Sequence, residues 1–204
     1  MRVIHIIPSA FNYFDDIRAL AFELMEGLNG LGLENEAVAV QYGTTTKKTE
    51  AAVGHAAPSR RYIGTENFAE TLRDLQNYDI VHLHCPGLGA LGKICAWKKN
   101  NPGVPLVASY YRGVPLADFF SLFMILYNNF YLPRIFRSAE AITCFSGEIF
   151  RASRASGYLK NAGKLTVLGG LDSFALTKKT DEVKLTDKQG VIEKLALLYE
   201  SLKN

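Results

Sequence analysis

The sequence predicts an α/β domain: a parallel β-sheet with helices on both faces. Short β-branched runs alternate with segments of helical periodicity along most of the chain. The 204 residues are enough for one substantial domain. Hydrophobic residues make up 48% and charged residues 21%, the balance of a globular protein and not of a disordered one.

The chain opens with a strand–helix–strand pattern. Arg2 to Ile7 is a β-branched run that stops at Pro8, as a buried parallel strand would. Apolar residues then recur at three- and four-residue spacing from Ile17 to Leu28, which predicts a helix. With a second strand at Ala37 to Val40, this pattern indicates a right-handed βαβ unit.

The middle of the chain continues the alternation after Gly43 to Ser59, which lacks periodicity and is expected to be a long, mobile loop. A short helix is predicted at Glu66 to Gln76 and a strand at Asp79 to His84. The next helix, Leu88 to Lys99, leads to a strand at Pro105 to Ser109.

The remaining strands are shorter. Ala141 to Cys144 and Leu165 to Leu168 are predicted strands, and Ser146 is expected to cap a helix that runs to Ala155. Residues 177–188 are polar and read as a linker. Thr186 to Gln189 fits a capping box in front of an amphipathic helix. The apolar stripe of that helix, which needs a core to pack on, consists of Ile192, Leu195, Leu198, Tyr199 and Leu202.

Charge and cysteine content exclude several classes of protein. The 23 basic and 20 acidic residues give a net charge of +3, too little to indicate a nucleic-acid partner. Three widely spaced cysteines match no zinc pattern and indicate free thiols in a cytoplasmic protein. The first apolar run is too short for a signal peptide, and no stretch reaches the about 18 apolar residues of a membrane span.

Two histidines share one face of a predicted strand, because His82 and His84 alternate with Leu83. A metal site needs a third ligand, and no neighbouring residue supplies an obvious one, so we expect no metal. Two interpretations remain open: both histidines are buried and hydrogen-bonded, or His84 lines a ligand cleft at the carboxyl end of its strand.

Other residues that follow predicted strands are candidates for the same cleft. A tyrosine hydroxyl can orient a substrate and an arginine can offset phosphate charge, but neither is a ready base at neutral pH, so the catalytic residue is unknown. Gly87, Gly89 and Gly92 form a G-x-G-x-x-G pattern, but no acidic residue ends the next strand, and we interpret these glycines as packing residues. No cofactor is expected. The cleft candidates besides His84 are Phe11, Asn12, Tyr13, Tyr110, Tyr111, Arg112, Gly169 and Gly170.

The segment Leu116 to Phe136 carries an aromatic stripe at helical spacing. One interpretation is a helix that faces the core. The other is contact with a membrane surface, with basic residues beside an apolar face. The residues expected to contact the membrane are Phe119, Phe120, Phe123, Arg134 and Arg137.

Four stretches in this order resemble a known family. They are the opening strand ended by Pro8, the strand Tyr78 to His84 (YDIVHLH), the segment Ser138 to Ser146 (SAEAITCFS), and Leu165 to Phe174 (LTVLGGLDSF). Together they are similar to the N-terminal domain of family-4 glycosyltransferases (glycosyl transferases group 1), which have the GT-B fold. The resemblance implies a Rossmann-like domain that binds the acceptor.

The resemblance also implies a domain division and a function. Residues 1–174 would form the Rossmann-like acceptor-side domain. Residues 175–188 would form a linker in place of the donor domain, and residues 189–204 a helix that packs back on the first domain.

The expected function is transfer of a hexose from a nucleotide sugar to a glycan or lipid-linked acceptor, with this chain alone inactive. The nucleotide sugar would bind only with a donor domain present, and the protein would be cytoplasmic or peripheral at the inner face of the membrane. A non-catalytic binding module and one subunit of a split glycosyltransferase are the alternatives.

Overall fold

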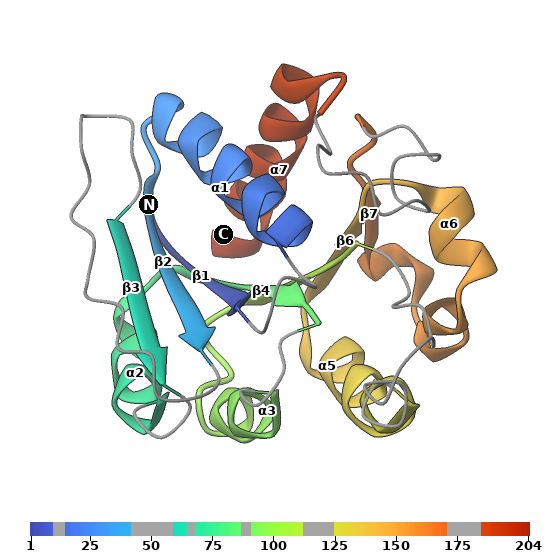
Figure 1. Ribbon diagram of the computed structural model, residues 1–204, viewed down its shortest axis with the longest axis horizontal. Helices are drawn as coiled ribbons and strands as arrows, with labels where there is room; N and C mark the ends of the chain where they lie inside the picture. The colour runs from blue at the N-terminus through green and yellow to red at the C-terminus, as the bar shows by residue number, and fades with distance from the viewer. Residues whose placement is uncertain (10–14, 42–58, 65–67, 87–90, 112–124, 171–184) are drawn as a thin grey trace.

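Seven parallel strands form one open sheet with helices on both faces (Figure 1). The computed structural model describes residues 1–9, 15–41, 59–64, 68–86, 91–111, 125–170 and 185–204. The strand order is β3-β2-β1-β4-β5-β6-β7, and each neighbouring pair is parallel. The predicted α/β class and parallel sheet are therefore confirmed.

The central strands are buried on both faces, as their near-continuous apolar sequences predict. Every residue of β4, β5 and β6 is buried. The strands are β1 (Arg2–Ser9), β2 (Glu34–Gln41), β3 (Ser59–Gly64), β4 (Ile80–Cys85), β5 (Leu106–Tyr110), β6 (Ala141–Cys144) and β7 (Leu165–Val167).

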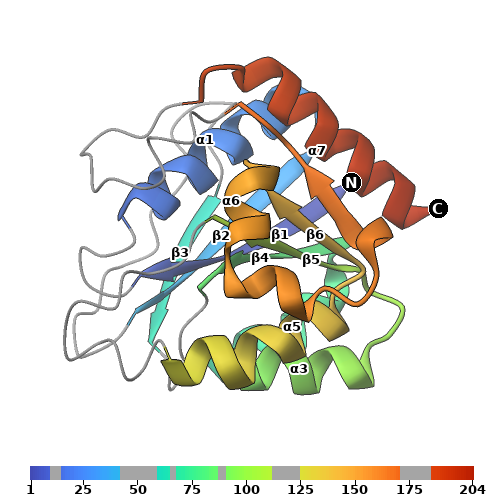
Figure 2. The same ribbon diagram turned by 90° about the vertical axis from the view of Figure 1, so that its right-hand side faces the viewer.

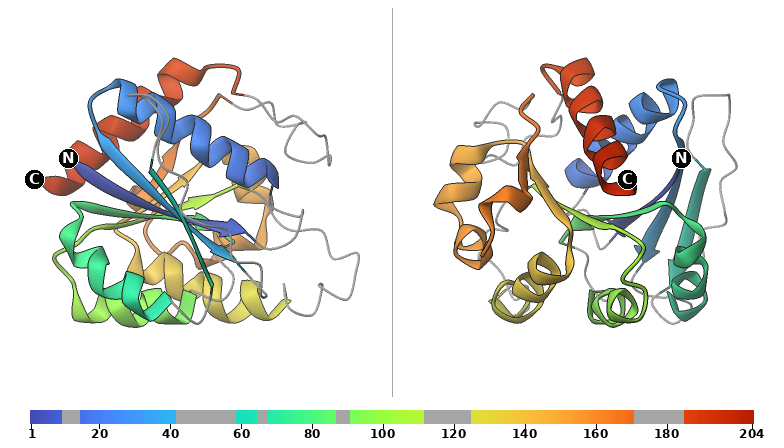
Figure 3. Two further views of the ribbon diagram at one scale, coloured as in Figure 1. Left: turned by 60° about the vertical axis from the view of Figure 1, so that its left-hand side comes forward. Right: turned by 180° about the vertical axis from the view of Figure 1, so that it is seen from behind.

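The helices divide between the two faces of the sheet. α1 and α7 cover one face, whereas α2, α3 and α5 cover the other (Figures 1 and 3). α5 continues the π-helical turn η3 (Tyr127–Tyr131). The bounds are α1 (Asp15–Gly30), α2 (Phe68–Asp74), α3 (Leu91–Asn100), α5 (Leu132–Ser138), α6 (Gly147–Ala152) and α7 (Lys188–Lys203).

The strand β3 corrects the sequence analysis, which predicted no strand between the expected loop and the helix that starts near Phe68. β3 is the edge of the sheet and pairs only with β2 among the described strands. An edge strand needs no continuous apolar run. Arg60 and Arg61 interrupt the apolar pattern of β3, so the sequence pattern did not indicate a strand there. The expected loop itself lies mainly in residues 42–58, outside the described residues.

Two helix ends also differ from the prediction. Ser146 caps α6 as expected, with its hydroxyl accepting a hydrogen bond from the amide of Ile149 at 3.3 Å, but α6 ends at Ala152. The cap of α7 is Asp187, one residue later than the capping box predicted, and it accepts from the amide of Gly190. Thr186 instead donates hydrogen bonds to the carbonyl oxygen of Gly170, which follows β7.

The terminal helix α7 packs beside α1 over the sheet (Figures 2 and 3). Its apolar stripe is in the main core: Ile192 and Leu195 are buried, and Leu198 and Leu202 are partly buried against it. Close approach depends on Gly27 of α1, because a Cβ there would lie 1.9 Å from Cδ1 of Ile192. An ion pair joins Lys188 to Glu23.

Candidate functional site

The strand order reverses between β1 and β4. From β1 the chain goes to β2 and β3 on one side, and then returns to β4 on the other side of β1. In open α/β sheets, ligands bind beyond the carboxyl ends of the strands at this type of reversal. The carboxyl ends of β1 and β4 are Ser9 and Cys85, so the candidate site lies at this edge.

Three buried histidines lie directly at the reversal. His5 of β1 is the register partner of His82 of β4, and His84 follows two residues later on the same face. The ligand atoms of the three side chains all lie within 4.8 Å of one another. All three side chains are completely buried. The sequence pattern predicted a shared face for His82 and His84 but gave no prediction for His5.

One set of hydrogen bonds runs from His84 across the sheet and has a definite direction. Asn35 Oδ1 can only accept, so Nε2 of His5 donates to it at 3.0 Å. A neutral His5 must then accept at Nδ1, from Nε2–H of His84 at 2.9 Å. Nδ1 of His84 in turn accepts from the hydroxyl of Tyr111. The amide of Asn35 continues the chain by donating to Asn29 Oδ1 at 2.7 Å.

A second set centres on His82 and reaches the terminal helix. Nδ1 of His82 is hydrogen-bonded to the hydroxyl of Tyr199 in α7. Nε2 is hydrogen-bonded to the hydroxyl of Ser109 at 2.7 Å, and Ser109 contacts the hydroxyl of Thr143 at 2.6 Å. Polar side chains from β4, β5, β6 and α7 are thereby joined in the core.

Burial keeps the histidines neutral. It lowers the pKa of His5 to about 4 and holds the pKa values of His82 and His84 well below 6.5. Burial also raises the pKa values of Tyr111 and Tyr199 well above 10, so both phenols keep their protons. The site therefore contains neutral donors and acceptors and no charged group among these residues.

The three histidines could hold a metal ion by composition, but their hydrogen bonds argue for a different role. All six ring nitrogens have hydrogen-bond partners. A zinc ion would need nitrogens about 2.1 Å away and would leave partners such as Asn35 or Tyr111 buried without a hydrogen bond. The geometry fits a closed polar network, and the expectation of no metal stays a prediction.

The predicted cleft residues fall into three groups. His84, Tyr110 and Tyr111 are buried, with at most 5% of the side chain exposed, which fits the structural interpretation left open for His84. Gly169 and Gly170 have positive φ angles and are partly exposed at the end of β7. Contact of these residues with an acceptor stays a prediction. Phe11, Asn12, Tyr13 and Arg112 lie outside the described residues.

Of the predicted membrane-contact residues, Arg134 and Arg137 lie exposed on α5, while Phe119, Phe120 and Phe123 lie outside the described residues. In the described part of the aromatic segment, some residues face the core and others are exposed as a membrane contact would require. Tyr127, Leu132, Ile135 and Phe136 belong to the core, whereas Ile125, Leu126, Phe130 and Tyr131 are exposed. None of the described helices is long and apolar enough to span a membrane.

Comparison with known proteins gives structural likenesses only. No family model matches the sequence, and no curated protein matches it. An alpha-glucosyltransferase, solved with UDP-glucose and DNA containing an abasic site, has a TM-score of 0.53 at 14% identity. The match covers 82% of this chain and 41% of that chain, so this chain spans well under half of that enzyme's length.

Two further structures extend the likeness. A sucrose-phosphate synthase chain from Thermosynechococcus elongatus has a TM-score of 0.53 at 14% identity. The match covers 99% of this chain and 99% of that chain, so it includes α7. S. aureus MnaA, solved with UDP, has a TM-score of 0.50 at 14% identity, with 88% of this chain and 48% of that chain covered. The chain has the Rossmann-like fold of GT-B glycosyltransferases.

At these identities the likeness shows the fold alone. The alpha-glucosyltransferase was solved with UDP-glucose and DNA, and MnaA was solved with UDP. The expectation of no nucleic-acid partner therefore receives no support from them.

Proposed function

We propose that this chain is the acceptor-side part of a family-4 glycosyltransferase, which transfers a hexose from a nucleotide sugar to a glycan or lipid-linked acceptor. The GT-B fold supports the proposal, and so do the motifs quoted above for β1, β4, β6 and β7. The hydrogen bond between Tyr199 of α7 and His82 of β4 supports the proposal, because the resemblance implies a terminal helix that packs back on the first domain.

The observation that carries the proposal is the junction between β7 and α7. The amide and the hydroxyl of Thr186 both donate to the carbonyl of Gly170, at 2.7 and 3.0 Å. A Cβ on Gly170 would lie 2.4 Å from Val191 Cγ2 and 3.2 Å from the carbonyl oxygen of Asp187, and the φ of this residue is +72°, so the position requires a glycine. Gly170 and Thr186 are therefore direct neighbours in space although they lie 16 positions apart in the sequence.

Such a junction can accept an inserted domain without disturbing the sheet or α7, because entry and exit lie side by side. In the resembled family the donor domain occupies this point. Here 15 residues separate Gly170 and Thr186, so we infer that the donor-binding residues come from elsewhere: a longer parent protein or, in a split enzyme, a second chain. The split enzyme is the alternative that the closed junction favours.

Calorimetry with UDP- and GDP-sugars tests the proposal. We expect the chain alone to show no stoichiometric binding at micromolar affinity and no turnover. Adding a donor domain, either fused at the junction between Gly170 and Thr186 or supplied as a separate chain, should create nucleotide-sugar binding. Tight binding or turnover by the chain alone would overturn the proposal, and so would a fused donor domain that folds and binds sugar but never transfers it to any glycan or lipid acceptor.

We also propose a peripheral position at the inner face of the membrane. Phe130 and Leu126 are 57% and 44% exposed on the turn that leads into α5, and Arg134 lies one turn later. An apolar side facing lipid beside basic residues near anionic headgroups is the pattern of interfacial helices.

A further inference from the structure

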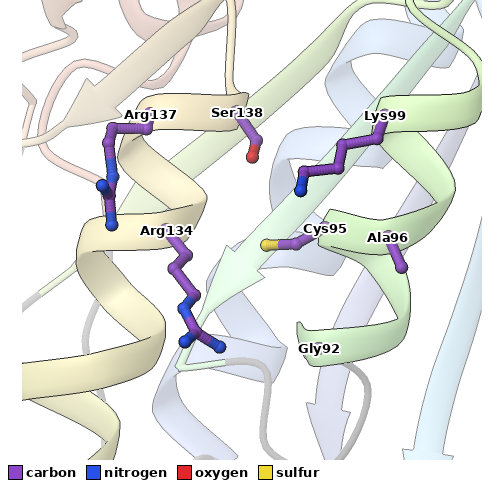
Figure 4. A pocket seen from close by; sticks show the side chains of 7 residues that line it. All are labelled: Gly92, Cys95, Ala96, Lys99, Arg134, Arg137 and Ser138. Atoms are coloured by element: carbon purple, nitrogen blue, oxygen red, sulfur yellow. The ribbon is translucent and has the colours of Figure 1, made fainter.

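A groove of about 590 Å³ lies between α3 and α5 (Figure 4). These two helices are on the face of the sheet opposite to α1 and α7 (Figure 1). None of its described lining residues belongs to the histidine network. Its size falls in the range of about 300–1,000 Å³ that is typical of small-molecule sites. The described residues that line it are Gly92, Cys95, Ala96, Lys99, Arg134, Arg137 and Ser138.

Polar groups from both helices converge in this groove. Lys99 and Cys95 extend from α3 toward α5, and Arg134 extends from α5 toward the Gly92 end of α3 (Figure 4). The hydroxyl of Ser138 points into the space between the helices (Figure 4). Arg137 instead folds back along its own helix, where its Nε donates to the carbonyl of Pro133 at 3.1 Å. Lys99 and Arg134 are therefore the two cations that face the groove.

No carboxylate lines the groove among the described residues. The neighbouring Lys98 shows the contrast: its Nζ lies 2.9 Å from the Glu140 carboxylate and also donates to two backbone carbonyls. A cation in the last turn of a helix is favoured by the helix dipole, and this accounts for Lys99. It does not account for Arg134, which lies a turn before the end of α5 and yet extends toward α3.

We propose that this groove binds a phosphoryl group. The Lys99 ammonium and the Ser138 hydroxyl supply donors for phosphate oxygens at one end of the groove, and the Arg134 guanidinium adds positive charge toward the Gly92 end (Figure 4). Tyr131 lies beside the Gly92 end, since a Cβ on Gly92 would lie 3.8 Å from its Cε1. Beyond that end lie the exposed Phe130 and Leu126, so the rest of the ligand meets apolar side chains. The phosphate can belong to a soluble ester or to a lipid headgroup.

Cys95 gives a direct readout of occupancy. Its thiol lines the groove and is only partly buried, whereas Cys85 and Cys144 are buried. The rate of iodoacetamide alkylation at Cys95, followed by peptide mass spectrometry, should fall when glycerol 3-phosphate or vesicles of phosphatidylcholine with phosphatidic acid are added. Sodium chloride at matched ionic strength and phosphatidylcholine vesicles alone should give no protection. Alkylation of Cys85 and Cys144 reports any unfolding.

The double variant Lys99→Gln/Arg134→Gln should lose protection, with the ligand concentration for half-protection rising by about tenfold or more. The matched control, Lys93→Gln/Arg151→Gln, removes one lysine of α3 and one exposed arginine outside the groove and should protect like wild type. Protection by glycerol 3-phosphate identifies a soluble ester as a sufficient source, and protection by phosphatidic acid vesicles alone identifies a headgroup. Absence of protection by both probes, or equal protection of the double variant and wild type, would overturn the proposal. No step of the assay depends on sugar transfer, so its result is independent of the proposed activity.

Discussion

The hydroxyl of Tyr199 is hydrogen-bonded to Nδ1 of His82, which joins the last helix of the chain to its central strand across 117 positions of sequence. Both groups are completely buried, so water cannot replace either partner. Apolar packing, including the close contact of Ile192 with Gly27, restricts the position of α7 on α1. A buried polar pair is satisfied in a single register, and we infer that it fixes the position of α7.

Removing the Tyr199 hydroxyl should therefore destabilise the protein. Tyr199→Phe leaves Nδ1 of His82 without its partner, and we expect the free energy of unfolding in urea to fall by about 1–3 kcal/mol. Tyr158→Phe is the control, since its hydroxyl is exposed and bonded only at 3.4 Å to Asn129. Equal, small effects of the two variants would contradict a structural role for the Tyr199 hydroxyl.

Acid should weaken the folded state through the histidines. The folded-state pKa of His5, about 4, lies below the unfolded value of 6.5, so the unfolded chain binds more protons between these pH values. Stability is then fully present above about pH 6.5 and falls as the pH drops toward 4, by roughly 2 kcal/mol at pH 5 from His5 alone. His82 and His84, shifted in the same direction, add to this loss. Urea unfolding at pH 7, 6 and 5 measures it, and a free energy of unfolding that stays constant over this range would contradict the buried neutral network.

The contact of Gly27 with Ile192 predicts a change of sign in a double-mutant cycle. Gly27→Ala places a methyl group on Ile192 and should cost about 1–3 kcal/mol in the wild-type background. In the Ile192→Ala background the methyl has space, and the better helix propensity of alanine should stabilise α1 by up to about 1 kcal/mol. Gly30→Ala, where a Cβ meets nothing within 4 Å, is the control in the same helix and should not destabilise. Stabilisation by Gly27→Ala in both backgrounds would show that α7 does not pack closely at this point.

Membrane contact should depend on the exposed apolar residues of the turn before α5. We expect the protein to sediment with anionic vesicles and not with neutral ones, and Phe130→Ser should reduce the bound fraction several-fold because about 57% of its side chain is exposed to the lipid side. Leu197→Ser on α7, 64% exposed on the opposite face of the sheet, is the control for loss of a surface apolar group. If the protein sediments with neither type of vesicle, the proposed peripheral position is contradicted. If Phe130→Ser and Leu197→Ser reduce binding equally, the membrane contact does not lie at this turn.

Local sequence patterns predicted most of the elements because each pattern reports on burial. The β-branched runs at β1 and β4 and the three-and-four spacing of α1 and α7 follow directly from which residues must face the core. The edge strand β3 was not predicted because one side of it has no neighbouring strand among the described residues, so its sequence need not be apolar. The cap of α7 was misplaced by one residue because Thr186, a good cap by type, is engaged by Gly170.

The candidate site was predicted only in part. His82 and His84 share a strand, so their common face follows from the two-residue period of a strand. His5 carried a signal that was available: it interrupts a β-branched run as His82 does, and β1 and β4 are neighbours in a sheet that reverses at β1. Tyr199 and Asn35 carried no such signal, because nothing in their local sequence distinguishes them from ordinary helix and strand residues.

The sequence by itself determined the alternation of strands and helices, the parallel sheet and the amphipathic character of the last helix, since these depend on periodicity over a few neighbouring residues. The tertiary structure alone decided which polar side chains meet: His5 with His84, Tyr199 with His82, and Thr186 with Gly170 at the junction. These contacts join positions that are 16 to 117 residues apart where a hydrogen bond connects them. Their partners are selected by strand register and helix packing, which are properties of the whole core and leave no periodic trace in the sequence.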